Sequence, residues 1–271
     1  MRVAEPVQSS WKARLCLGFE NREGKTVLSR REHDGPLVVQ KALYPEGDAV
    51  CHAIVVHPPG GIAGGDELSL NSKIQENAQV LMTAPGAAKW YRSAGPWARQ
   101  RLLFDVQGTL EWLPRESIVF DAARASLECD VEMGDEGRYI GWEVVCLGRT
   151  GSGERFGRGE LRSRTALKRG GRLLWREQGS IDGGGRIMSS PAGLGGRSVF
   201  GTFLCAAAGE FPSVKGEISP TLAVTKLPGV LVARYLGDSS GEAMAQFIRL
   251  WKVLRPALIG RDAIEPRIWG T

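Results

Sequence analysis

The segment that most limits what this chain can fold into runs from Val55 to Asp66 and reads Val-Val-His-Pro-Pro-Gly-Gly-Ile-Ala-Gly-Gly-Asp. Its two prolines fix φ and supply no backbone donor, and its two glycine pairs permit dihedral angles that other residues avoid. It lies between two strand-like runs. We therefore expect a rigid loop that places His57 and Asp66, shaped by Pro58, Pro59, Gly60, Gly61, Gly64 and Gly65.

Most of the remaining chain reads as short strands. Glycine accounts for 36 of 271 residues, about twice its average usage, and turn residues recur at short intervals. Two of the expected strands, 67–74 and 78–83, are predicted to form a hairpin around Glu76 and Asn77. The other expected strands are 13–19, 26–30, 37–43, 49–57, 101–106, 109–113, 117–120, 125–133, 139–148, 202–208, 221–225 and 229–236.

One helix is clear near the C-terminus. Ser239, followed three residues later by Glu242, makes a capping box, and apolar residues recur at helical spacing until Pro256, where we expect the helix to end. Gly237 to Gly241 also matches the G-x-S-x-G pattern of serine hydrolases, but no histidine follows Ser239, so the helix cap explains these residues better. No repeat or linker divides the chain, and we expect a mainly β, single domain over residues 1–271.

Charge and cysteine usage narrow the possible partners and the compartment. The chain has 35 basic and 30 acidic residues, a net charge of +5, which is compatible with an acidic protein partner and too weak to indicate nucleic acid. The five cysteines are widely spaced and form no C-x-x-C pair, which favours a reducing compartment. No apolar run approaches the ~20 residues of a membrane helix. We expect a cytoplasmic protein with no membrane segment.

Two groups of residues are candidates for chemistry. Cys51, His57 and Asp66 suit divalent ions, but Cys51 and His57 would lie ~20 Å apart on a straight strand, too far to chelate one ion. Carboxylates also interrupt apolar runs, and such a charge requires a salt bridge, a metal or an aqueous channel. These carboxylates are Glu111, Glu116, Asp121 and Glu143.

Residues 83–93 form a second unusual segment, Thr-Ala-Pro-Gly-Ala-Ala-Lys-Trp-Tyr-Arg-Ser. Pro85 and Gly86 mark a turn, and small residues precede a cluster of basic and aromatic side chains. This mixture suits an interface. The expected partner-binding residues are Lys89, Trp90, Tyr91 and Arg92.

With these residues identified, the chain resembles the urease accessory protein UreD family, also called UreH, over nearly its whole length. Residues 51–52 and 57–66 look like the C-H and H-P-P-G-G-I-x-G-G-D motifs of the family, and residues 83–93 are similar to T-x-P-G-A-x-K-x-Y-R-S. Residues 111–121 resemble E-W-L-P-Q-E-x-I-x-F, with Arg115 where glutamine is common. Further similar segments are 145–149, 153–154, 254–256 and 266–269.

The resemblance implies an irregular multi-stranded β assembly, with layered or helicoid-like sheets and a few helices, that is not an enzyme. It also implies binding to UreF, to the GTPase UreG through UreF, and to urease apoprotein, so that nickel reaches the urease active site. No tightly bound cofactor is expected. A nickel ion would pass transiently through a water-filled tunnel, and GTP would belong to UreG.

We hypothesise that a transient nickel route is lined by Glu111, Glu116, Asp121 and Glu143, with His57 and Asp66 near an opening. Scattered carboxylates suit a conduit because a cation must enter it and also leave it. Two alternatives stay open. One is a cupin-like metal-dependent β-barrel enzyme that uses His52, His57 and Asp66. The other is a pure interface protein that docks through residues 83–93 and contacts no metal.

Overall fold

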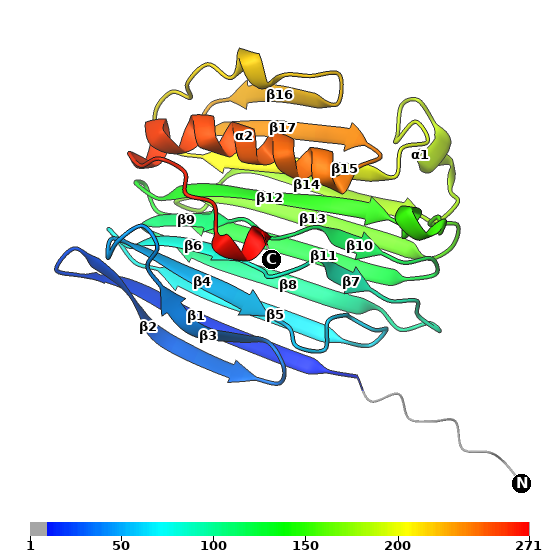
Figure 1. Ribbon diagram of the computed structural model, residues 1–271, viewed down its shortest axis with the longest axis horizontal. Coiled ribbons are helices and arrows are strands. Elements are labelled where there is room, and N and C mark those ends of the chain that lie inside the picture. Colours follow the sequence, from blue (N-terminus) through cyan, green and yellow to red (C-terminus); the bar gives the residue numbers. More distant parts are fainter. Residues whose placement is uncertain (1–9, 271) are drawn as a thin grey trace, which may run out of the picture.

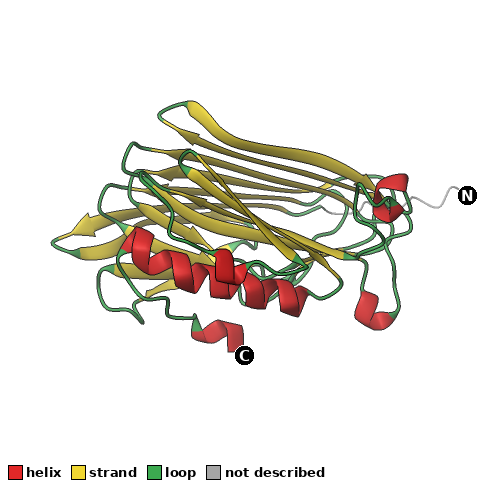
Figure 2. Cartoon of the chain, turned by 90° about the horizontal axis from the view of Figure 1, so that it is seen from above, coloured by secondary structure: helices red, strands yellow, loops and turns green. Residues whose placement is uncertain are grey.

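The structure, a computed structural model, describes residues 10–270, and within them the chain forms two stacked β-sheets with one long helix on an outer face (Figures 1 and 2). The seven-stranded sheet, here called sheet A, contains β1 (Lys12–Arg22), β2 (Lys25–Asp34), β5 (Glu67–Ile74), β8 (Ala98–Val106), β11 (Arg124–Met133), β13 (Glu160–Arg169) and β14 (Arg172–Asp182).

The ten-stranded sheet, here called sheet B, is paired less regularly. It contains β3 (Val38–Leu43), β4 (Val50–Val56), β6 (Gln79–Thr83), β7 (Ala88–Trp90), β9 (Thr109–Trp112), β10 (Ser117–Val119), β12 (Arg138–Leu147), β15 (Val199–Ala206), β16 (Leu222–Leu227) and β17 (Val230–Gly237). The helices are α1 (Arg186–Ser189) and α2 (Ser240–Ile259), with 3-10 turns η1 (Thr150–Ser152), η2 (Lys215–Glu217) and η3 (Arg267–Gly270). This confirms the mainly β, irregular layered fold with its clearest helix near the C-terminus.

The middle of the chain winds between the two sheets. β4, β6, β9 and β12 are parallel neighbours in sheet B, and β5, β8, β11 and β13 are parallel neighbours in sheet A, so successive segments cross from one sheet to the other. The predicted hairpin of residues 67–74 and 78–83 is therefore wrong. The turn at Glu76 and Asn77 is real, and Asn77 has a positive φ of 59°, but it connects the sheets instead of pairing the two strands.

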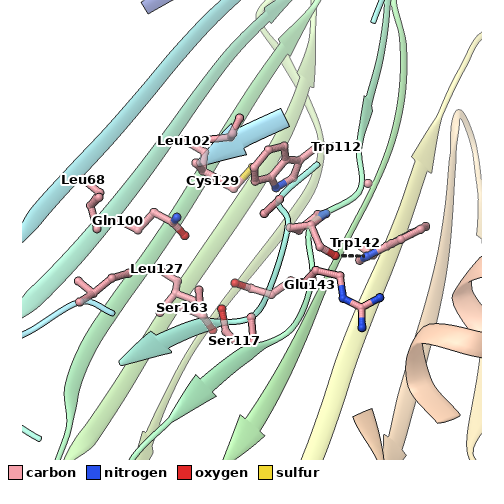
Figure 3. Close-up of a pocket in the computed structure, with 18 of the residues that line it drawn as sticks. Leu68, Gln100, Leu102, Trp112, Ser117, Leu127, Cys129, Trp142, Glu143 and Ser163 are labelled. Carbon is pink, nitrogen blue, oxygen red and sulfur yellow. Dashed lines mark hydrogen bonds between the residues drawn. The ribbon is translucent and has the colours of Figure 1, made fainter. Parts of the chain in front are cut away.

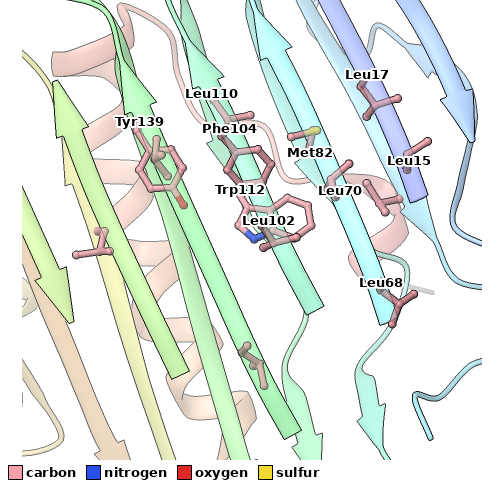
Figure 4. Packing of buried hydrophobic residues seen from close by; sticks show 14 of the residues in the cluster. Leu15, Leu17, Leu68, Leu70, Met82, Leu102, Phe104, Leu110, Trp112 and Tyr139 are labelled. Atoms are coloured by element: carbon pink, nitrogen blue, oxygen red, sulfur yellow. The ribbon is translucent and has the colours of Figure 1, made fainter. Parts of the chain in front are cut away.

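Alternating side chains of both sheets meet in the main hydrophobic core. Figure 4 shows Leu15 and Leu17 of β1, Leu70 of β5 and Phe104 of β8 facing the same interior as Leu110 of β9. This follows from the period of two along each strand, which sends alternate residues to opposite faces. Both faces of β4, β6, β9 and β12 are largely buried because a second apolar cluster lies on the outer face of sheet B.

Helix α2 covers that outer face. Its N-terminus is capped by Ser239, whose hydroxyl accepts a 3.2 Å hydrogen bond from the Glu242 amide, as the sequence predicts. The helix does not end at Pro256 but continues to Ile259, with Gly260 in a left-handed conformation. A proline in the last turn removes few helical bonds, and burial of Leu254 and Ile259 holds that turn against the sheet. Within residues 10–270, no helix is both long and apolar enough to cross a membrane.

Candidate functional site

A cavity of about 380 Å³ lies between the two sheets. Figure 3 shows that strand residues of both sheets point into it, including Leu102, Cys129 and Ser163 from sheet A and Glu143 from sheet B. Its rim is formed by three non-strand segments, in residues 57–62, 84–87 and 114–115. Both unusual segments of the sequence therefore contribute to one site.

These two segments are also joined to each other. The Ile62 amide donates to the Lys89 carbonyl oxygen at 2.7 Å, and the Tyr91 amide donates to the Ile62 carbonyl oxygen at 2.9 Å. Ile62 and Trp90 form an isolated parallel bridge between the loop and β7. The proline and glycine loop is thus fixed on the edge of sheet B by main-chain hydrogen bonds.

Side chains of the second segment explain two of the glycines. A Cβ atom on Gly61 would lie 2.1 Å from the Tyr91 ring, and one on Gly64 would lie 2.3 Å from the Ser93 Oγ. Gly60 has a φ of +72°, where other residues are strained. The glycines therefore permit close contact between the segments and one sharp turn, as expected for a rigid loop.

Asp66 shapes this loop through both of its carboxylate oxygens. Oδ2 accepts from the Ala63 amide and Oδ1 accepts from the Trp11 amide, each at 2.7 Å, and the residue is only 2% exposed. Asp66 does not line the cavity. Its carboxylate is occupied by backbone donors and acts on the shape of the loop.

His57 lines the cavity at its rim. Its Nε2 atom is buried and has no hydrogen-bond partner among the described residues. Burial lowers the pKa of His57, and the charge of Asp66 opposes this only in part. The ring is therefore neutral at neutral pH, and a neutral imidazole carries one nitrogen lone pair that can bind a cation.

Glu143 of β12 is the second predicted residue that lines the cavity. Its carboxylate has no hydrogen bond or ion pair within residues 10–270, although it is half-buried. Burial, assisted by the negative charge of Glu177, raises its pKa to about 7. A carboxylate in this state gains from any cation that enters the cavity.

Glu177 of β14 stands close enough to affect Glu143 but is itself partnered. Its carboxylate accepts from the Arg234 guanidinium at 2.6 Å and from the Thr202 hydroxyl at 3.3 Å. Glu128, which also lines the cavity, is paired with Arg164 at 3.3 Å. Among the described residues of the lining, Glu143 is therefore the one carboxylate without a cation, and the two ion pairs limit the negative charge inside the cavity.

Glu111 lies on the other face of sheet B, beneath α2. It accepts a 2.6 Å bond from the Trp251 indole, and the Arg255 guanidinium binds both of its oxygens at 3.0 to 3.1 Å. Burial raises the pKa of Glu111, and the positive charge of Arg255 works against that rise. Glu111 is thus part of a buried ion pair and not of the cavity, which corrects its expected place on the route.

The ion pair extends into a larger buried network. Arg255 also binds Glu46 at 2.7 Å, and Glu46 in turn contacts the His52 Nε2 at 2.6 Å. Burial pushes the pKa of Glu46 upward, but the hydrogen bonds from His52 and Arg255 outweigh it, so its pKa lies below the ordinary value. This network, Glu46–His52–Glu111–Arg255, joins α2 to the strands beneath it.

The last two predicted acids also lie outside the cavity. Asp121 binds the Arg158 guanidinium at 2.8 Å and accepts from the Gly157 and Arg158 amides, so the pKa of Asp121 is lowered by Arg158. Glu116 has Arg115 at 3.7 Å and a buried Oε2 without a hydrogen-bond partner among the described residues. Of the six residues expected on one route, the structure brings only His57 and Glu143 to the cavity.

The four expected partner-binding residues differ in their exposure to solvent. Lys89, Tyr91 and Arg92 are exposed, whereas Trp90 is fully buried in the core. This corrects the expectation for Trp90, because its side chain is not at the surface. The other three remain available to a partner.

Several polar residues of the cavity were not singled out from the sequence. They are Gln100, Ser117, Glu128, Cys129, Ser163, Thr165, Glu177 and Thr202. The signal that could have found some of them is a polar residue at an inward strand position, such as Ser163 and Thr165 between Leu161 and Leu167. Alternation along a strand predicts which residues share a face, but it does not predict that a cavity lies between the two sheets at these positions.

The donor set favours weak contact with an ion over tight chelation. Among the described residues, no group of three or more His, Cys, Asp or Glu side chains is placed to hold a metal. The cupin-like alternative is also contradicted by geometry. His52 is bound to Glu46 beneath α2, while His57 faces the cavity and Asp66 faces backbone amides.

Comparison with known proteins gives one consistent result. A sequence model described as the UreD urease accessory protein matches residues 12–270. The chain is 48% identical to the urease accessory protein UreD of Azoarcus sp. over 283 residues, covering 100% of this chain and 98% of the relative. It is 48% identical to the UreD protein of Dechloromonas aromatica over 286 residues, covering 99% and 98%. These relatives are named as accessory proteins and not as enzymes. The chain therefore belongs to the UreD family of urease accessory proteins.

Proposed function

We propose that this protein supports urease maturation as a non-catalytic scaffold that conducts nickel through the cavity between its sheets. In this proposal the chain acts in the cytoplasm, binds UreF and through it UreG, and docks on urease apoprotein. Nickel is cargo that passes through, and no cofactor stays bound. The single observation that carries the nickel route is the pair of unpartnered groups, His57 Nε2 and the Glu143 carboxylate, that face one cavity.

The chemistry of these groups fits a transit site. A lone carboxylate and a neutral imidazole attract a divalent ion, while hydroxyl and amide groups of Ser163, Thr202 and Gln100 replace part of its hydration. Too few charged ligands are present to hold the ion strongly. An ion that enters such a site can also leave it, as delivery to another protein requires.

The rim supports the scaffold part of the proposal. Residues 57–66 and 84–92 form one rigid unit at the mouth of the cavity, fixed by Gly61, Tyr91 and main-chain hydrogen bonds. A partner that docks on this unit would stand directly over the mouth. Transfer could then occur without release of nickel to the solvent.

The test uses cells that express urease subunits, UreF, UreG and this chain, in which urease is purified and its nickel content and activity are measured. Glu143→Gln keeps the shape of the side chain and removes its charge. We expect about a tenfold loss of nickel in urease, in the range found when groups that tune a metal site are changed. Glu136→Gln is the matched control, because Glu136 is exposed and does not belong to the cavity lining.

The pure interface protein remains the competing function. If His57→Gln and Glu143→Gln both leave the nickel content unchanged while the complex still assembles, nickel does not pass through this cavity. The chain would then act only by docking. A normal yield of complex in both variants is needed for that conclusion.

A further inference from the structure

A row of polar side chains runs across sheet B from the cavity toward one side of the sheet. Glu143 of β12 is paired in register with Thr202 of β15, and Thr202 is paired in register with Arg234 of β17. Residues paired in this way lie on the same face of a sheet, with Cβ atoms about 4.5–5.5 Å apart. Arg234 follows Val230 and Val232, which belong to the core between the sheets, so the row faces sheet A.

Glu177 meets this row from sheet A. Its carboxylate accepts from the Arg234 guanidinium at 2.6 Å and from the Thr202 hydroxyl at 3.3 Å. Thr202 is therefore a neighbour of both Glu177 and Glu143, and the charge of Glu177 accordingly contributes to the raised pKa of Glu143. Two carboxylates thus flank one threonine inside the cavity, and the guanidinium is bonded to Glu177.

Arg234 acts on the cavity from outside. It does not belong to the lining, whereas Glu143 and Glu177 do, and its side chain is 48% exposed. Its guanidinium also lies over the ring of Trp175, at 5.7 Å from the centroid, and Trp175 is on the same face of β14 as Glu177. An exposed ion pair adds little to stability, so the main effect of this one is on the charge inside the cavity.

The number of free carboxylates decides how strongly the cavity holds a cation. If Glu177 had no cation, it would face the cavity together with Glu143, with the Thr202 hydroxyl between them. Two carboxylates attract a divalent cation more strongly than one, because each adds a negative charge and an oxygen ligand. Strong binding opposes passage, since an ion that is held tightly does not leave.

We propose that Arg234 is a positioning residue that keeps the affinity of the cavity for divalent cations low, because its guanidinium occupies the Glu177 carboxylate that would otherwise join Glu143 in binding the ion. The use of a low affinity rests on the proposed nickel route. The effect of Arg234 on the affinity is a property of this chain and can be measured without urease.

The first test measures binding of nickel chloride to the purified full chain by isothermal titration calorimetry. Arg234→Gln frees Glu177, and we expect the affinity for nickel to rise by about 10-fold to 100-fold, the range over which neighbours of metal ligands change affinity. Arg234→Lys should bind nickel like the wild type. Lysine supplies the same charge, and a single hydrogen bond to Glu177 does not require the guanidinium fork.

The controls separate this effect from the loss of any ion pair. Arg197 and Asp238 also lie 2.6 Å apart, both are exposed, and neither belongs to the cavity lining. Arg197→Gln frees Asp238 and should bind nickel like the wild type. Adding Glu177→Gln to Arg234→Gln should remove the gain in affinity, because Glu143 is then the one charged carboxylate of the pair.

Wild-type affinity in Arg234→Gln, or a gain that survives the added Glu177→Gln, overturns this role of Arg234. The nickel content of urease from cells with the same variants tests the route separately. If both proposals are correct, Arg234→Gln retains nickel and lowers the nickel content of urease. If it binds nickel more tightly and urease still fills normally, Arg234 has the proposed role and the nickel route fails. If it binds nickel like the wild type while Glu143→Gln lowers the nickel content of urease, the route stands and the role of Arg234 fails.

Discussion

Two glutamates on neighbouring strands of sheet B show how the two faces of the same sheet differ. Glu111 of β9 pairs in register with Ile140 of β12, three residues before Glu143. Glu111 faces α2, where Arg255 and Trp251 bind it directly. Glu143 faces the opposite side and has no partner within the described chain.

The two carboxylates differ in whether a cation of the same chain neutralises them. On the face under α2, a cation of the same chain neutralises each buried carboxylate, so these charges join the helix to the sheet. Burial raises the pKa of both carboxyls, but on the cavity face Glu143 has no cation beside it to stabilise its charged form. A site that keeps such a group has lost some stability and can recover it when a cation binds.

The largest expected effect comes from the network beneath α2. Arg255→Ala leaves Glu111 and Glu46 buried without their shared cation, and we expect the free energy of unfolding to fall by about 3–5 kcal/mol. Denaturant unfolding followed by circular dichroism measures this. Arg249→Ala on the same helix is the control. Arg249 is exposed and lies 3.6 Å from Glu217. A loss above about 1 kcal/mol in Arg249→Ala would show that the buried network is not more important for stability than an exposed ion pair.

The same substitution in the two glutamates should have opposite effects on stability. Glu111→Gln weakens charged hydrogen bonds to Arg255 and should lower the free energy of unfolding by about 2 kcal/mol. Glu143→Gln removes a buried charge and leaves no partner unsatisfied, so it should raise the free energy of unfolding by about 1–3 kcal/mol near pH 8. If both variants changed the free energy of unfolding in the same direction, the two faces of sheet B would not differ in the way described.

The pH dependence of the Glu143 effect has a definite direction. Its pKa is about 7 in the folded state and near 4.5 in the unfolded state, so between these values the folded protein binds more protons. Its contribution to stability is present below about pH 4.5 and is lost as the pH rises toward 7. The gain in Glu143→Gln should therefore appear over this range. A gain that is equal at pH 4.5 and pH 8 would mean that the carboxylate is not the cause.

Two glycines that line the cavity should differ in how much an added Cβ atom changes the free energy of unfolding. Gly61→Ala places a Cβ against the Tyr91 ring and should lower the free energy of unfolding by about 1–3 kcal/mol. Gly86→Ala meets no atom and should change it by less than about 0.5 kcal/mol. Thermal unfolding of both variants measures this. A large loss in Gly86→Ala would show that the glycine has a role inside the chain.

The smallest expected loss from removing a native contact is at the helix cap. Ser239→Ala removes the bond to the Glu242 amide and should cost about 1 kcal/mol of stability. Urea unfolding measures this loss, and nickel loading of urease should stay normal because the cap is outside the cavity lining. A loss as large as that of Arg255→Ala would mean that the cap, and not the charge network, anchors α2.

Much of the local structure could be predicted from sequence, because it depends on neighbouring residues. Proline and glycine in residues 55–66 predicted a rigid loop, Ser239 and Glu242 predicted a helix start, and alternation predicted strands. The helix end at Pro256 was wrong, because burial of Leu254 and Ile259 outweighs one missing hydrogen bond. Local propensity decides less where tertiary packing is strong.

The candidate site could be predicted only in part. His57 and Glu143 were identified, but so were Asp66, Glu111, Glu116 and Asp121, which the structure places outside the cavity. The sequence shows that a carboxylate interrupts an apolar run, and this holds for a salt bridge and for a channel alike. Only the position of the cation distinguishes them, and Arg255 lies 144 residues from Glu111.

The sequence by itself determined most of the strands, the shaped loop, the start of the capped helix and, through its motifs, the family, but it did not predict β7, β13 or β14. The tertiary structure decided which strands pair, that residues 67–74 and 78–83 belong to different sheets, and which acids remain free. The physical reason is that propensity and alternation act between near neighbours, whereas the environment of a charge depends on every segment packed around it. Glu111 and Glu143 look alike in the sequence and differ only because α2 covers one face of their sheet and a cavity lies on the other.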